Sequence, residues 1–151
     1  MSEAERIANL HRCAFDGFSW HGPHVFEVLE GVDAARAARK PASGAHSIWE
    51  IVLHIRAWEE IVLRRLRGEL VEPKTEQDWP PVAGSGEGAW KGALVALRET
   101  HDELNRAIAG LDDSALERVT AGGRTSYYVL AHGAVHHALY HAGQIAILKK
   151  G

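Results

Sequence analysis

The sequence is poor in cysteine, and its single thiol, Cys13, cannot form an internal disulfide bond. A secreted scaffold held together by disulfides is therefore excluded, and we expect a reducing, cytoplasmic compartment. The sequence also lacks an excess of basic residues, since 17 Lys and Arg stand against 20 Asp and Glu and give a formal net charge of −3. Recognition of nucleic acid needs clustered positive charge, so we expect no nucleic-acid partner.

Targeting signals and several enzyme motifs are missing as well. Residues 1–12 contain no apolar core of a signal peptide, and no nucleotide-binding, serine-hydrolase or zincin motif occurs. Residues 125–148 contain no charged side chain and are long enough to span a bilayer, but they carry four histidines and a glutamine. Such polar groups are costly in hydrocarbon, so we expect no membrane contact and interpret the segment as a fully buried central helix.

Apolar residues recur at spacings of three and four along most of the chain, which is typical of helices. Ser47 and Glu50 form a capping box at the start of one of these helices. We expect helices over residues 2–19, 23–30, 47–67, 87–109 and 126–149, with a break at Gly22-Pro23 and one short turn at 113–117.

The stretch 69–86 contains three prolines and two glycines and is expected to be a loop between the second and third long helices. Its length suggests either a crossover between opposite ends of a bundle or a lid. The chain length predicts one domain, residues 1–151, and the helices predict an all-α, four-helix bundle.

What the sequence has in excess is histidine, with ten imidazoles. Imidazole is the commonest metal ligand and titrates near neutral pH. The last helix holds two pairs at a spacing of four, which places both rings of a pair on one helix face: His132/His136 and His137/His141. Each pair shares a stripe with apolar residues, so periodicity leaves open which pair faces the core.

His54 lies on the apolar face of the 47–67 helix, between Ile51 and Trp58. A single histidine in that setting is most simply a core residue with one polar partner. Combined with a histidine pair on another helix it predicts a metal site, because bundle cores commonly hold such sites. Three neutral imidazoles would leave coordination positions open, which is typical of a catalytic site.

The residues around these histidines resemble a known family. The segments HSIWEIVLHIRAW (46–58) and HALYHAGQI (137–145), together with the turn at 20–23, look like the DinB/YfiT-like family of metal-dependent proteins. The resemblance covers nearly the whole chain. It implies a four-helix bundle in which a divalent cation, often zinc or nickel, is held by His54, His137 and His141. It also implies a homodimer.

Other candidate site residues have simpler explanations. Glu50 lies one turn before His54 and could orient it or act as a base, although the capping box accounts for it. His136 adjoins His137 but points away from it, and is expected to be packed or beside the site. His21 could line the mouth of the site or be an exposed turn residue, and Trp58 could line the site or fill the core. Three further histidines are expected on the surface: His11, His46 and His101.

Two functions follow as hypotheses. The first is a metal-dependent enzyme in which the cation acidifies a bound water or a low-molecular-weight thiol, as a hydrolase or a thiol S-transferase acting on a small molecule. The resemblance supports it, because characterised relatives include transferases and isomerases that use bacillithiol or mycothiol. The second is a metal- or ligand-binding bundle without turnover, such as a stress-related module, and it is motivated by the lack of an identifiable general base.

Overall fold

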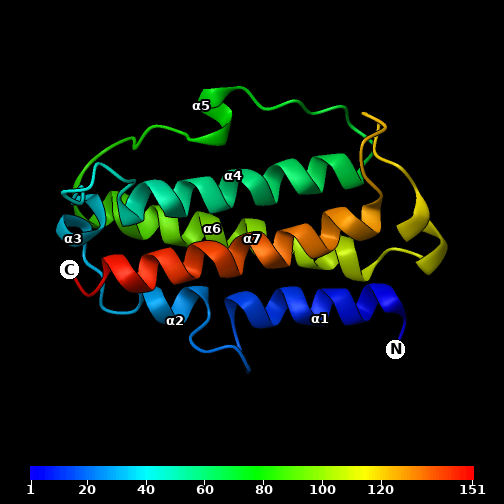
Figure 1. Cartoon of the computed structure of the whole chain (residues 1–151), viewed down its shortest axis with the longest axis horizontal. Coiled ribbons are helices and arrows are strands. Elements are labelled where there is room, and N and C mark those ends of the chain that lie inside the picture. The colour runs from blue at the N-terminus through cyan, green and yellow to red at the C-terminus, as the bar shows by residue number, and fades with distance from the viewer.

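Four long helices form the body of the molecule (Figure 1). The computed structural model describes residues 1–151, and its long helices are α1 (Glu3–Phe15), α4 (Ile48–Leu66), α6 (Gly86–Ala109) and α7 (Tyr127–Leu148). Four shorter elements join them: α2 (Val25–Leu29), α3 (Ala34–Ala38), α5 (Thr75–Asp78) and the 3₁₀ helix η1 (Asp113–Glu117). Extended backbone pairs only at one isolated bridge, between residues 119 and 126. The predicted all-α, four-helix bundle is confirmed.

Helix caps explain where most of these elements begin. The Ser47 hydroxyl accepts from the Glu50 N–H at 3.2 Å, and the Glu50 carboxylate accepts from the Ser47 N–H at 2.7 Å, so the expected capping box is present. The first helix is shorter than predicted because the chain turns at Gly17, whose φ of +96° suits glycine. Helix α3 was not predicted, and the Asp33 side chain caps it.

The long connection after α4 is a crossover. It leaves the end of α4, runs back along the bundle and enters α6 at the end where α4 begins, so α4 and α6 are parallel (Figure 1). Helix α5 lies midway along this segment, beside α4. Of the two alternatives for residues 69–86, the crossover is therefore the one that the fold requires, and α5 is a helix within it.

Two apolar clusters fill the two halves of the bundle. One contains Trp49 and Trp90 and the other contains Ile7 and Leu104, each with residues of all four long helices. Along the sequences of α1, α4 and α6, a buried polar residue falls between the members of the two clusters: His11, Glu59 and His101. A polar layer therefore separates the two apolar clusters near the middle of the bundle.

Helix α7 is half-buried and not fully buried, which corrects the expectation from its lack of charge. Its inner face includes Leu130, Ala134 and His141, all less than 9% exposed. The opposite stripe faces outward, with Val129 57% and Ile147 74% exposed. A helix at the side of a bundle keeps one face in water whatever its composition. No helix has the length and hydropathy needed to cross a membrane.

Candidate metal centre

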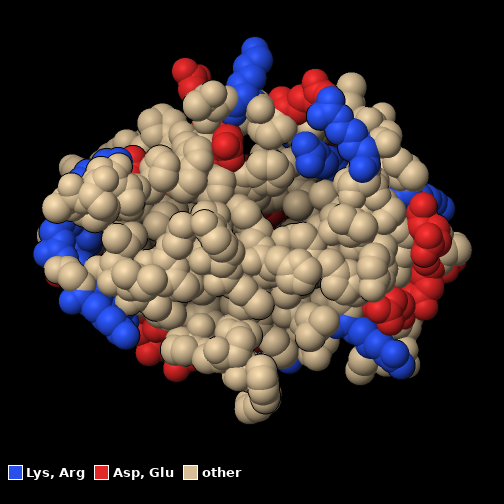
Figure 2. Space-filling model, viewed as in Figure 1, with Lys and Arg blue, Asp and Glu red and all other residues tan.

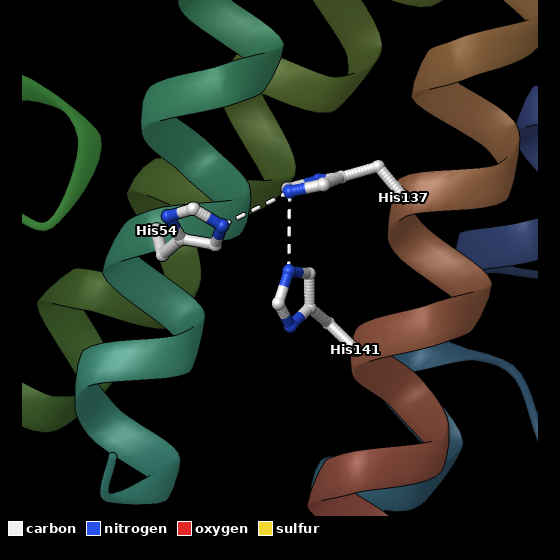
Figure 3. Close-up of side chains that lie close together, drawn as sticks. All are labelled: His54, His137 and His141. Atoms are coloured by element: carbon white, nitrogen blue, oxygen red, sulfur yellow. Dashed lines mark hydrogen bonds between the residues drawn. The ribbon is translucent and has the colours of Figure 1, made fainter. Parts of the chain in front are cut away.

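Three imidazoles from two helices point at one another (Figure 3). Nε2 of His137 lies 3.0 Å from Nε2 of His54 and 3.1 Å from Nε2 of His141. His54 and His141 are each 5% exposed, and His137 is partly buried. Helix α4 supplies His54 from its apolar face, and α7 supplies the other two from consecutive turns. The structure thus brings together the three histidines that the sequence singled out.

Hydrogen-bond acceptors behind two of the rings fix the tautomers of those rings. Nδ1 of His54 lies 2.6 Å from the backbone carbonyl oxygen of Asp78, and Nδ1 of His141 lies 2.6 Å from Oε1 of Gln144. Both oxygens can only accept, so each Nδ1 carries the proton and donates it. The Nε2 atom of each ring then holds a lone pair, directed at the centre of the cluster. Metal-binding histidines are typically oriented in this way by a partner behind the ring.

The surroundings also keep the three rings uncharged. Burial lowers the pKa of His54 and His141 below the ordinary value. Burial, followed by repulsion from His141 and His54, lowers the pKa of His137 to about 3. At neutral pH all three are therefore neutral imidazoles, the form that binds a metal.

Hydrogen bonds among the three rings cannot pair all of their inward-facing nitrogen atoms. His54 and His141 both present a lone pair toward His137, whose Nε2 carries at most one proton. A divalent cation at the centre would accept all three lone pairs. Two nitrogens on one tetrahedral zinc lie about 3.3 Å apart, close to the distances observed here. An all-imidazole donor set suits zinc, nickel and similar ions. The residues therefore fit the cation that the resemblance implied.

The crossover segment covers one side of this cluster. Trp79, the residue after α5, stacks on the His54 ring at 3.8 Å and 7°. It also stacks with His46 at 3.5 Å and 8° and lies edge-on to His141 at 6.2 Å. The Asp78 carboxylate accepts from the indole N–H of Trp58 at 2.7 Å and lies 3.3 Å from Nδ1 of His54. Asp78 and Trp79 were missed from the sequence, where their only signal was an acidic–aromatic pair inside a long loop. Gln144 was also missed, although it lies three residues after His141 within the segment 137–145.

A cavity of about 440 Å³ opens beside the histidines. Figure 2 shows a hollow near the centre of this face, with acidic atoms at its bottom and mostly uncharged surface around it. The cavity lies between α4 and α7, and Asp78 of α5 is also part of its lining. Its polar lining consists of the three histidines, Asp78, Glu59 and Thr125. It gives a small molecule access to the point where the imidazoles meet.

The remaining candidate residues divide clearly. Trp58 lines the cavity, which agrees with the first of the two roles predicted for it, lining the site or filling the core. Glu50 does not, because its carboxylate bonds the Ser47 N–H and the Lys40 ammonium, at 2.6 and 2.7 Å for the latter. His136 and His21 are exposed and lie outside the cavity lining. A site-lining role for Glu50, His136 or His21 therefore has no support in the geometry.

A second histidine cluster was missed, and the expectation that His11 and His101 lie on the surface was wrong. His11, Glu59 and His101 are 0%, 3% and 2% exposed. Nε2 of His11 lies 3.1 and 3.0 Å from the two Glu59 oxygens, and Nδ1 of His101 lies 3.5 Å from one of them. Each histidine has polar neighbours in the sequence, but those neighbours occupy other faces of the helix. His46, in contrast, is exposed as expected.

The hydrogen bonds of this second cluster differ from those of the first. The Asn105 amide nitrogen donates to the Ala8 carbonyl at 2.6 Å and lies 3.2 Å from Nδ1 of His11. An amide nitrogen only donates, so Nδ1 of His11 accepts and its Nε2 donates to Glu59. Burial raises the pKa of Glu59, but His11 and His101 lower it by more, so the carboxylate is ionised. The ligand atoms are close enough to hold a metal, yet His11 has no free lone pair facing Glu59.

One of three comparisons with known proteins finds a match. A family model described as the DinB superfamily matches residues 18–145, a range that contains all three converging histidines and the crossover. None of the curated proteins and none of the solved structures compared with the chain matches it. The family model covers far more than half of the 151 residues. The chain therefore belongs to the DinB superfamily.

Proposed function

We propose that this protein is a divalent-metal-dependent enzyme whose metal ligands are His54, His137 and His141. Zinc or nickel is the ion we expect, and a small molecule in the adjoining cavity is the substrate. One observation carries the proposal: three neutral imidazoles converge through Nε2, and partners behind two of the rings hold the lone pairs inward. Such an arrangement has no purpose in packing alone, since it leaves buried acceptors facing one another.

A cation held by three neutral imidazoles keeps its full charge and would lower the pKa of a water or thiol beside it. The chain contributes the rest. The Asp78 carbonyl and the Gln144 amide orient two of the ligands, and the Trp79 ring shields His54 from solvent. Three protein ligands leave coordination positions open toward the cavity, where a substrate can approach. The reaction we propose is hydrolysis or transfer of a low-molecular-weight thiol.

The thiol must come from solution, because the chain's only cysteine does not line the cavity. We therefore propose that the protein works in the cytoplasm, where small thiols are kept reduced. Assembly as a homodimer stays a prediction from the family resemblance.

Binding without turnover is the second candidate, and one observation favours it. Both carboxylates that line the cavity already accept hydrogen bonds, Asp78 from Trp58 and Glu59 from His11. Each carboxylate is thereby held in a fixed orientation and shares its acceptor capacity with another donor, so neither is a dedicated general base, although a metal-activated nucleophile does not strictly need one.

Turnover measurements separate the two candidates. The zinc- and nickel-loaded protein would be assayed with an epoxide, an alkyl halide and an activated ester, each with and without a small thiol. Enzymatic function predicts turnover that needs the metal and falls at least ~100-fold in His137→Ala, because three-ligand coordination is lost. His136→Ala, the exposed neighbour, is the matched control and should keep its rate. A stoichiometric metal without any turnover would favour the binding function.

A further inference from the structure

The cavity beside the three histidines has apolar walls. Trp58 and Val62 of α4 form one side, and Val129, Leu130, Ala134 and Tyr140 of α7 form the other. Its volume of about 440 Å³ lies in the range usual for small-molecule sites, roughly 300–1,000 Å³. From His141 to Val129 the lining follows α7 for twelve residues, which corresponds to roughly 18 Å of helix. The space is therefore long enough for a molecule of two or three rings.

No basic side chain lines this cavity, and its only charged residues are Glu59 and Asp78. The guanidinium of Arg65 lies 5.7 Å from the centre of the Trp58 ring, but it donates to the Val71 carbonyl at 2.8 and 3.2 Å. It is thereby held outside the lining. An anionic group against the apolar walls, away from the three histidines, would lose its hydration, meet no basic side chain and share the cavity with two carboxylates. Burial of an unpaired charge under these conditions is strongly unfavourable.

We propose that the cavity binds an uncharged small molecule with an apolar, ring-containing body and one polar group that reaches the three histidines. Assigning the polar group to the metal rests on the proposed function, whereas the charge and polarity of the body rest on the cavity walls alone. Molecules that carry a phosphate or carboxylate on the part that lies against the apolar walls are excluded as occupants. A thiol that carries carboxylates would have to keep them outside the cavity, in solvent.

Two fluorescent probes with the same ring skeleton test the charge. N-phenyl-1-naphthylamine is uncharged, and 8-anilino-1-naphthalenesulfonate adds one sulfonate. Each would be titrated into the full-length, metal-free protein, with its emission followed. We expect the uncharged probe to bind at least ~10-fold more tightly, because the sulfonate must be desolvated without a partner. Equal affinity for the two probes, tighter binding of the sulfonate, or no binding of either would overturn the proposal.

Substitutions at two glycines of α7 test whether the uncharged probe binds in the cavity. Gly133 lines the cavity and Gly143 does not, and a Cβ atom added at either would meet no atom within 4 Å. Gly133→Phe should weaken binding of the uncharged probe at least ~10-fold by filling the cavity from its wall, whereas Gly143→Phe should change it less than ~2-fold. An equal effect of both variants would place the probe elsewhere, for example on the exposed face of α7, and would refute the assignment.

Adding a positive charge to the apolar wall gives a second check of where the probes bind. Val129 lines the cavity and is 57% exposed, so Val129→Lys adds a cation there without burying it. It should strengthen binding of the sulfonate probe about 10-fold, while Ile147→Lys, on the exposed face outside the cavity, should not. All these titrations use metal-free protein. A protein that binds no zinc or nickel would refute the proposed function and leave these results standing, whereas failure of the probes would refute only the proposed occupant.

Discussion

The two buried histidine clusters differ mainly in what lies behind the rings. In the His54/His137/His141 cluster, oxygens of Asp78 and Gln144 accept the Nδ1 protons, so lone pairs face inward. Behind His11 an amide nitrogen of Asn105 donates, so the N–H of that ring faces inward, toward Glu59. The first arrangement suits a cation and the second suits a carboxylate. Proximity of the ligand atoms, which the two clusters share, does not distinguish them.

The clusters differ in their place in the bundle as well. His11, Glu59 and His101 connect α1, α4 and α6, inside the layer that separates the two apolar clusters. The other cluster connects α4 and α7, and all three of its histidines line the cavity, which only Glu59 of the inner cluster reaches. We interpret the inner cluster as structural and the cavity cluster as functional. Variants of the two should therefore change different properties, stability in one case and metal affinity in the other.

The largest expected effect is on stability, at Glu59. Glu59→Ala leaves two buried histidines without their shared partner and should destabilise the metal-free protein by about 3–5 kcal/mol, as loss of one member of a buried pair typically does. Urea unfolding measures it. The exposed neighbour supplies the control, since Glu60→Ala should cost less than ~0.5 kcal/mol. If the two variants proved equally stable, the inner cluster would have no structural role.

A smaller effect is expected at Gln144, behind the cavity cluster. Gln144→Leu removes the acceptor for Nδ1 of His141 and frees the ring to adopt the wrong tautomer. We expect zinc affinity to fall about 10–100-fold, with little change in secondary structure. Competition with a fluorescent zinc chelator measures the affinity. Asn105→Leu, the equivalent change behind His11, should leave zinc affinity unchanged, and a comparable loss there would erase the distinction between the clusters.

The smallest expected effect is a fall in the stability of the metal-free protein as the pH drops. His54, His101, His137 and His141 have lowered pKa values in the folded, metal-free protein, whereas the unfolded chain titrates near 6.5. Below that pH the unfolded chain binds more protons, so stability falls as the pH drops. His137 alone should contribute a loss of roughly 2 kcal/mol between pH 6.5 and 5.

Urea unfolding at the two pH values, with a chelator present, checks this dependence. Titration of Glu59 does not contribute between pH 6.5 and 5. A carboxyl group whose pKa is lowered in the folded state reduces the free energy of unfolding only below the pKa it has in the unfolded chain, near 4.5. His137→Phe should flatten the profile more than His101→Phe does, because the folded-state pKa of His137 is lowered further, to about 3. A flat profile in the unmodified protein would show that the cavity histidines are not desolvated.

The sequence predicted the long helices because their signals are local. Capping residues such as Ser47 and Ser126 and apolar spacing lie within each helix. His54 could be identified in the same way, from the apolar face around it. The choice of His137 and His141 needed the family resemblance, because the stripe of His132 and His136 is equally apolar; in the structure it faces solvent.

The features that escaped prediction depend on contacts between distant segments. His11 is buried because Glu59, 48 residues away, offers it a partner, and no local pattern reports that pairing. Asp78 and Trp79 reach His54 across 24 residues or more because the crossover happens to fold along α4. A polar residue is placed by its partner and an apolar one by its helix face, which is why the core was easier to predict than the polar networks.

The metal content of three proteins tests the central claim most directly. The unmodified protein, His137→Ala and His101→Phe would each be saturated with zinc, desalted and measured by mass spectrometry, with folding checked by circular dichroism. His101→Phe keeps an aromatic ring against Phe15, on which His101 stacks at 3.9 Å. We predict one equivalent of zinc in the unmodified protein, none in His137→Ala and one in His101→Phe. A full equivalent retained in folded His137→Ala, or lost in folded His101→Phe, would contradict the assignment of the metal to the cavity histidines.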